Sequence, residues 1–78
     1  MLREVRRLQV GDWVMGADGK PRRVTGIGYW TRRTRFLEID GAPDGVMFNN
    51  DLVEVAEARL AEAFHAYDAA LAEREAQS

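Results

Sequence analysis

A short stretch of the chain, residues 26–36, crowds cations and aromatic rings together in a way that suggests binding chemistry. It reads Gly-Ile-Gly-Tyr-Trp-Thr-Arg-Arg-Thr-Arg-Phe, and its three cations are Arg32, Arg33 and Arg35. The rings of Tyr29 and Trp30 can stack on nucleic-acid bases, while planar guanidinium groups can bind phosphate or stack on rings. The same composition is also typical of a solvated hairpin tip. The stretch therefore supports two interpretations, a binding surface and an exposed turn.

The rest of the chain offers no catalytic set. Because it contains no cysteine, disulfides, thiolate metal sites and cysteine nucleophiles are excluded. His65 is the single histidine, and Asp68 follows three residues later, but no further group completes a nucleophile, a base and an orienting acid. We therefore expect a surface histidine, no catalytic residue and no enzyme.

A cluster of oxygen-bearing side chains between residues 40 and 51 invites a calcium interpretation. Its members are Asp40, Asp44, Asn49, Asn50 and Asp51. Their spacing does not match an EF-hand loop, and Asn-Asn-Asp fits a turn at least as well. We expect neither a metal ion nor any other cofactor.

Composition describes a small folded domain. The 78 residues are 46% hydrophobic and 31% charged, and a chain of this length buries about 60–65% of its unfolded surface. Residues 1–8 carry charges where a signal peptide needs an apolar core, and no run approaches the roughly 18 apolar residues of a membrane span. These features favour a cytoplasmic chain with no membrane contact.

Charge is divided unevenly along the chain. Residues 1–37 hold nine basic and three acidic residues, a balance of +6, whereas residues 38–78 have a balance of −8. The basic half creates a local positive potential that a polyanion can sense within a Debye length of about 8 Å. The two halves can equally well neutralise each other within one molecule.

Short segments separated by turn residues predict four or five strands in the first 55 residues. The expected strands are 11–16, 22–29, 34–40, 46–48 and 52–55. Asp18-Gly19 predicts a tight hairpin turn, and the Pro- and Gly-containing segment 41–45 predicts another. Strands this short favour a small antiparallel barrel or meander, because closure protects their edges.

From Ala56 the hydrophobic period changes to that of a helix. Leu60, Phe64, Tyr67 and Leu71 recur at spacings of four, three and four residues, which places them on one stripe. We expect a barrel over 1–55 and a helix over 56–76 whose stripe packs on the barrel above Trp13, within a single domain. A second, alanine-rich face allows a weak dimer as the alternative to a monomer; its members are Ala58, Ala61, Ala66, Ala69 and Ala72.

The beginning of the chain resembles small SH3-like barrels of the KOW and Tudor type. The matching residues are Leu8-Gln-Val-Gly-Asp-Trp-Val14, Asp18-Gly19 and Arg23-Val-Thr-Gly-Ile27. The resemblance covers residues 8–55 and implies an α+β fold, an SH3-like antiparallel barrel followed by one helix. Such barrels commonly bind RNA, DNA or peptides. Self-splicing Hint domains share the Val-Gly-Asp strand but need a nucleophile at the first position, where this chain has Met1.

These observations lead to two functional hypotheses. The first is a non-enzymatic module that contacts nucleic acid through the basic, aromatic hairpin: Tyr29 and Trp30 stack on bases, and Arg32, Arg33 and Arg35 hold phosphates, flanked by Arg22 and Arg23. The second is a protein-interaction module. In style, such compact alanine- and arginine-rich chains resemble accessory proteins of phages and mobile elements, which implies a host protein as partner.

Overall fold

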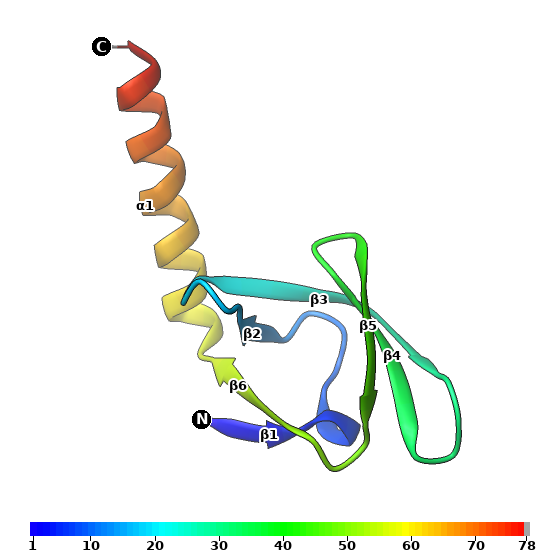
Figure 1. The fold of residues 1–78 in the computed structure, drawn as a ribbon. Coiled ribbons are helices and arrows are strands. Elements are labelled where there is room, and N and C mark those ends of the chain that lie inside the picture. Colours follow the sequence, from blue (N-terminus) through cyan, green and yellow to red (C-terminus); the bar gives the residue numbers. More distant parts are fainter. Residues whose placement is uncertain (78) are drawn as a thin grey trace.

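The computed structural model describes residues 1–77 and shows a curled antiparallel sheet with one helix at its end (Figure 1). Along the chain the elements are β1 (Leu2–Glu4), the 3-10 helix η1 (Val5–Arg7), β2 (Trp13–Met15), β3 (Pro21–Tyr29), β4 (Thr34–Ile39), β5 (Ala42–Phe48), β6 (Leu52–Ala56) and α1 (Ala58–Gln77). The six strands lie in the order β1-β6-β2-β3-β4-β5. This half-barrel and helix confirm the predicted α+β class and are compatible with an SH3-like fold.

The turn between β2 and β3 forms as the sequence predicts. Gly19 takes a φ of 78°, a conformation that glycine adopts without steric cost. The Asp18 carboxylate accepts a hydrogen bond from the Lys20 amide at 3.0 Å, and the Gly16 amide donates to the Lys20 carbonyl at 2.9 Å. Side chain and backbone therefore close this hairpin together.

Of the segment 41–45, predicted as a turn, residues 42–45 belong instead to β5. Asp40 and Gly41, with φ of 52° and 79°, make the turn by themselves. Pro43 is tolerated in the strand because β5 lies at the edge of the sheet, where a missing N–H breaks no ladder. Strand β5 has one residue more than β4 at this point, because Leu37 pairs with Gly45 and Glu38 pairs with Pro43. The register of the two strands therefore shifts between Leu37 and Glu38.

The N-terminal segment is part of the sheet and the core, which the sequence did not predict. Residues 2–4 pair with β6, and Arg3 lies opposite Val53. Val5 in η1 is fully buried and packs with Leu8, Leu37 and Val55. Three-residue elements carry too little periodicity to be recognised, so the burial of Val5 depends on contacts far along the chain.

The helix follows β6 with only Glu57 between them, and it touches the barrel through its first turns. Ala61 is 1% exposed, but Leu60, Tyr67 and Leu71 are 65%, 68% and 39% exposed. The expectation that the stripe packs on the barrel is therefore wrong for these three residues, and Phe64 is only half-buried. Contact is made instead by Ala61 and His65, about 100° around the helix from the stripe.

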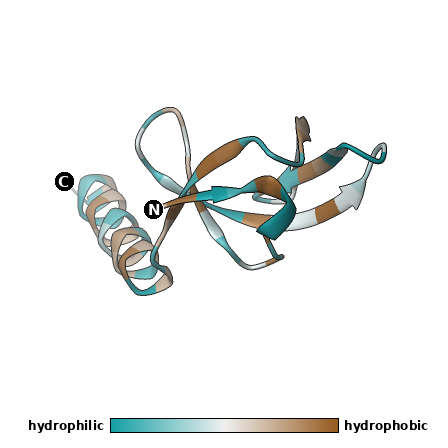
Figure 2. Ribbon diagram, turned by 90° about the horizontal axis from the view of Figure 1, so that it is seen from below, coloured by the Kyte–Doolittle hydropathy of each residue, from teal (hydrophilic) through white to brown (hydrophobic). Residues whose placement is uncertain are grey.

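The helix is longer than the barrel end that it meets. The twenty residues of α1 span about 30 Å, and its last turns project beyond the sheet (Figures 1 and 2). The molecule is correspondingly elongated, at 51 × 23 × 18 Å. The radius of gyration of 14.3 Å exceeds the roughly 11.5 Å of a compact chain of this length. Within the described residues, no helix is both long and apolar enough to cross a membrane.

His65 connects the helix to the sheet. Its Nε2–H donates to the Pro21 carbonyl at 2.7 Å, and its ring lies 5.1 Å from that of Trp13. Trp13 is half-buried against the helix, as expected, although the group above it is the imidazole rather than the stripe. Because Ala61 is buried in the barrel, the alanine-rich face expected to support a dimer is not free along its whole length.

Candidate nucleic-acid interface

Three segments that are distant in sequence are joined at one end of the half-barrel. The Asn49 amide donates to the Arg33 carbonyl at 2.7 Å, and the Asn49 side chain donates to the Arg32 carbonyl at 3.1 Å. The Arg6 amide donates to the Asn49 carbonyl at 3.0 Å. Asn49 thus ties together η1, the β3–β4 loop and the β5–β6 turn. We call this region the basic end, after its exposed cations: Arg6, Arg7, Arg32 and Arg33.

One face of the sheet next to the basic end carries aromatic residues. Leu37 points into the core at 2% exposure, so Phe36 beside it points to the outer face. The register pairs Phe36 with Val46 and Thr34 with Phe48, which places Phe36 and Phe48 on the same face. The Trp30 ring lies 6.3 Å from that of Phe36. We call this face the outer strip, and its members are Trp30, Phe36, Val46 and Phe48.

The outer strip is accessible to a flat ligand. Trp30 is 65% exposed and Phe48 is 58% exposed. Gly28 pairs with Phe36 across the sheet, and no atom lies within 4 Å of the place that a side chain at Gly28 would occupy. The absence of a side chain there leaves open space beside the Phe36 ring. Exposed rings in this arrangement can stack on bases or bind apolar side chains.

A hollow of about 410 Å³ joins the outer strip to the basic end. Its lining consists of Arg6, Arg33, Phe48, Asn49 and Asn50. The Arg6 guanidinium also contacts the Glu4 carboxylate at 3.0 Å, so part of its charge is compensated, and this exposed pair is weak. Cations and amide groups therefore lie directly beside an exposed ring, as binding of a phosphate next to a stacked base would require.

The structure does not bring the two predicted stacking residues onto one surface. Trp30 lies against Phe36 on the outer strip. Tyr29 is 84% exposed and lies against Arg35, whose guanidinium carbon is 5.0 Å from the ring centre. Neighbouring residues of an extended chain point to opposite sides, so Tyr29 faces away from the outer strip.

The Arg35 side chain is bound within the fold and does not project freely into solvent. Its Nη1 donates to the Arg6 carbonyl at 2.8 Å, which ties β4 to η1. Its Nε is buried and makes no hydrogen bond within the described residues. Of the three arginines predicted in the hairpin, Arg32 and Arg33 are therefore the exposed pair.

Arg22 and Arg23 lie at the other end of β3, about 20 Å from Tyr29 at 3.3 Å per residue. Arg22 contacts Asp18 at 2.9 Å and Asp40 at 3.5 Å. The guanidinium of Arg23 lies 5.5 Å from the centre of the Trp13 ring. The structure does not join these two cations to the hairpin, so the expected continuous basic and aromatic surface is interrupted.

The Asp18 carboxylate, near the start of β3, is bound by groups of its own turn and strand. The hydrogen bond from the Lys20 amide lowers the pKa of Asp18 below its usual 3.8; loss of solvent around the carboxylate opposes this effect, and the charge of Arg22 adds to it. The charge of Asp18 therefore interacts with the β2–β3 turn and Arg22, and not with the basic end.

The acids that invited a calcium interpretation are separated. Asp40 and Asp44 lie near the start of β5, and Asp51 follows its end, where its carboxylate accepts from the Phe48 amide at 3.0 Å. Over residues 1–77 no group of three potential metal ligands is found.

Sequence reasoning missed Phe36, Phe48 and Arg6 as members of the site. Alternation against the buried Leu37 could have placed Phe36 outside, and the pairing of β4 with β5 then brings Phe48 beside it. Arg6 had no such signal, because its place depends on contacts between η1 and a turn more than forty residues away.

Comparison with known proteins adds no relative. No protein-family model matches the chain, and neither the curated proteins nor the solved structures include a match.

Proposed function

We propose that this chain is a non-enzymatic module that binds single-stranded nucleic acid on the outer strip and the basic end. The observation that carries the proposal is the placement of Trp30, Phe36 and Phe48 on one open face beside Arg33 and Arg6. An SH3-like barrel of the KOW or Tudor type, which the beginning of the sequence resembles, would present such a face on a rigid sheet.

The aromatic rings and the arginines would bind different parts of the nucleic acid. Bases stack on Trp30 and Phe48, which is sequence-tolerant because every base has a flat face. Arg32 and Arg33 hold phosphates, and Arg6 adds a third cation at the hollow. A duplex keeps its bases paired and stacked, so single strands should bind better. Binding should weaken as the salt concentration rises, because each contact between an arginine and a phosphate releases a condensed counterion.

The test is a titration of the protein with a labelled single-stranded oligonucleotide of about 8 nucleotides, in DNA and RNA forms, at two salt concentrations. Fluorescence anisotropy gives the affinity, and quenching of tryptophan emission that is lost in Trp30→Ala reports stacking on Trp30 rather than on Trp13. We expect Trp30→Ala and Phe48→Ala each to weaken binding by about 1–3 kcal/mol. Arg33→Ala should reduce the dependence on salt by about one phosphate contact.

Matched controls separate this site from general charge and aromatic content. Tyr29→Ala removes an equally exposed ring on the other side of the sheet, and Lys20→Ala removes a cation at the distant β2–β3 turn. Both should bind like the parent protein. Absence of binding at low salt, or equal losses for Tyr29→Ala and Trp30→Ala, would refute the proposal.

A second candidate function is protein binding, favoured by the exposed apolar residues Leu60, Tyr67 and Leu71 of α1. It uses the opposite end of the molecule and so does not compete with the first proposal. A stoichiometric protein captured after nuclease treatment, and lost on Tyr67→Glu, would support it. Capture that survives Tyr67→Glu would count against the helix as the binding surface.

A further inference from the structure

The apolar stripe of α1 continues into a charged residue at each of its ends. Leu60, Phe64, Tyr67 and Leu71 alternate at four and three residues, as the a and d positions of a coiled coil do. Arg74 follows them by three residues. Glu57, the residue between β6 and α1, precedes them by three, and its carbonyl accepts the Ala61 amide at 3.0 Å as the start of the helix, so both residues extend the same line. We call this line the seam, and it consists of Glu57, Leu60, Phe64, Tyr67, Leu71 and Arg74.

The seam is complementary to a second copy of itself that runs in the antiparallel direction. Two antiparallel helices with the two-fold axis between Phe64 and Tyr67 pair each of these residues with the other in the second copy. The same register places Leu60 opposite Leu71, and Glu57 opposite Arg74. Every large apolar side chain of the seam then meets another, and each terminal charge meets its opposite.

A parallel pair lacks this complementarity. It would place Glu57 against Glu57 and Arg74 against Arg74, at seam positions where like charges repel. It would also bring both half-barrels to the same end of the helix pair. In the antiparallel arrangement the half-barrels lie at opposite ends, because each helix leaves its barrel at its own N-terminus (Figure 1).

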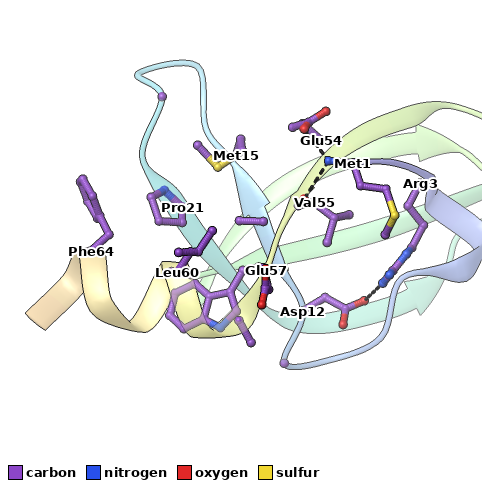
Figure 3. A pocket seen from close by; sticks show the side chains of 16 residues that line it. Met1, Arg3, Asp12, Met15, Pro21, Glu54, Val55, Glu57, Leu60 and Phe64 are labelled. Carbon is purple, nitrogen blue, oxygen red and sulfur yellow. Dashed lines mark hydrogen bonds and ion pairs between the residues drawn. The ribbon is translucent and has the colours of Figure 1, made fainter.

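The surface that the seam borders is hollow and apolar. A groove of about 930 Å³ lies between the first turns of α1 and the barrel, and Glu57, Leu60 and Phe64 are part of its wall (Figure 3). Pro21 and Met15 line its barrel side. In the antiparallel register, the C-terminal half of a second helix would run along this groove.

We propose that α1 is a self-association helix that pairs antiparallel with α1 of a second copy along the seam. Exposure of Leu60, Tyr67 and Leu71 in the single chain is what such a surface requires. Only four large side chains per copy are buried, so association depends on concentration. Dimer should form between about 1 μM and 1 mM and dissociate on dilution.

A charge-exchange experiment tests the register with the full chain. Glu57→Arg leaves two cations at the ends of the seam, and Arg74→Glu leaves two carboxylates. Sedimentation equilibrium should show each variant alone associating at least fivefold more weakly than the parent protein. An equimolar mixture of the two should recover association, because each new charge then faces an opposite one. A parent chain that stays monomeric at 1 mM, or a mixture no stronger than its components, would overturn the proposal.

Cysteine cross-linking gives an independent reading, since the chain has no cysteine of its own. Leu60→Cys together with Leu71→Cys should give a covalent dimer on oxidation. The two sites are about 16 Å apart within one helix, so they cannot bridge each other in a single chain. Leu60→Cys alone should remain monomeric under the same oxidation. Cross-linking of that single variant to itself would show a parallel pair and contradict the antiparallel seam.

Discussion

The basic end and the helix are built on opposite principles. At the basic end, backbone hydrogen bonds tie three distant segments together through Asn49, and the exposed side chains stand on a rigid base. The helix is continuous with β6 and contacts the sheet mainly through Ala61 and His65. The exposed rings next to the basic end stand on strands and loops that are hydrogen-bonded to one another. The exposed side chains of α1 are positioned only by the helix itself.

This difference shows what exposure means in a small chain. Phe48 is exposed because its neighbour Met47 on the other face of β5 packs against the core, and Trp30 is exposed in the loop that follows β3. Leu60 and Tyr67 are exposed because the helix meets the barrel through the neighbouring face that carries Ala61 and His65. Side chains of the first kind suit a preformed ligand surface, and those of the second kind suit a surface completed by another helix.

Removing a core leucine should separate the two regions most clearly. Leu37→Ala creates a cavity beneath the basic end and should lower the free energy of unfolding by about 2–5 kcal/mol. Leu71→Ala is the matched control on the helix and should cost under about 1 kcal/mol in the monomer. Urea unfolding at low protein concentration measures both, and equal costs would mean that the helix stripe is packed.

Enlarging the one buried residue of the helix should detach it. Ala61→Leu has no space at 1% exposure and should cost about 1–3 kcal/mol. Tryptophan emission should shift to longer wavelength as the imidazole leaves Trp13. Ala69→Leu, on an exposed position of the same helix, should leave both readings unchanged. A similar loss in the two variants would contradict the docking described for α1.

Weakening the second helix contact should have a moderate effect. His65→Ala removes the hydrogen bond to Pro21 and the ring above Trp13, and should cost about 1 kcal/mol. His65→Phe keeps a ring there but no donor, and should recover part of the loss. Urea unfolding followed by tryptophan emission reports both. No change in either variant would mean that the helix is held by Ala61 alone.

Deleting the chain after Asp68 should leave the half-barrel almost untouched. The removed turns project beyond the sheet, so the free energy of unfolding should change by less than about 0.5 kcal/mol at low concentration. Self-association should be lost with Leu71 and Arg74. Circular dichroism and sedimentation test the two statements separately, and an unfolded product would show that the distal helix supports the barrel.

The smallest effect concerns Asp18, whose folded pKa lies below its usual 3.8. A carboxyl group with a lowered pKa stabilises the folded state above its unfolded pKa, and the contribution disappears as the pH falls through the lower, folded value. An NMR titration should therefore give a midpoint under 3.8. Arg22→Ala should raise it only partway, since the Lys20 amide is the larger cause. Full recovery in that variant would assign the shift to Arg22.

Local signals in the sequence predicted local structure well. The Asp18-Gly19 hairpin, the strands around it and the helix all follow from turn chemistry and periodicity, and the structure has them. Periodicity also identified the apolar stripe of α1, but not its exposure, because tertiary contacts of Ala61 and His65 decide which face of the helix meets the barrel. Burial of Val5 and the gathering of Arg6 with Arg33 arise from contacts between distant segments, which no local pattern encodes.

The strand order has a consequence for the way the chain folds. Strands β3, β4 and β5 pair with their neighbours in sequence, so this meander can form as soon as its residues are synthesised. Strand β1 has no partner until β6, the last strand, arrives, and β2 lacks its second neighbour until then. Closing these long loops late slows folding and leaves two early strands open to wrong partners. The rate-limiting event should therefore be the arrival of residues 52–56, and substitutions there should slow folding more than those in the meander.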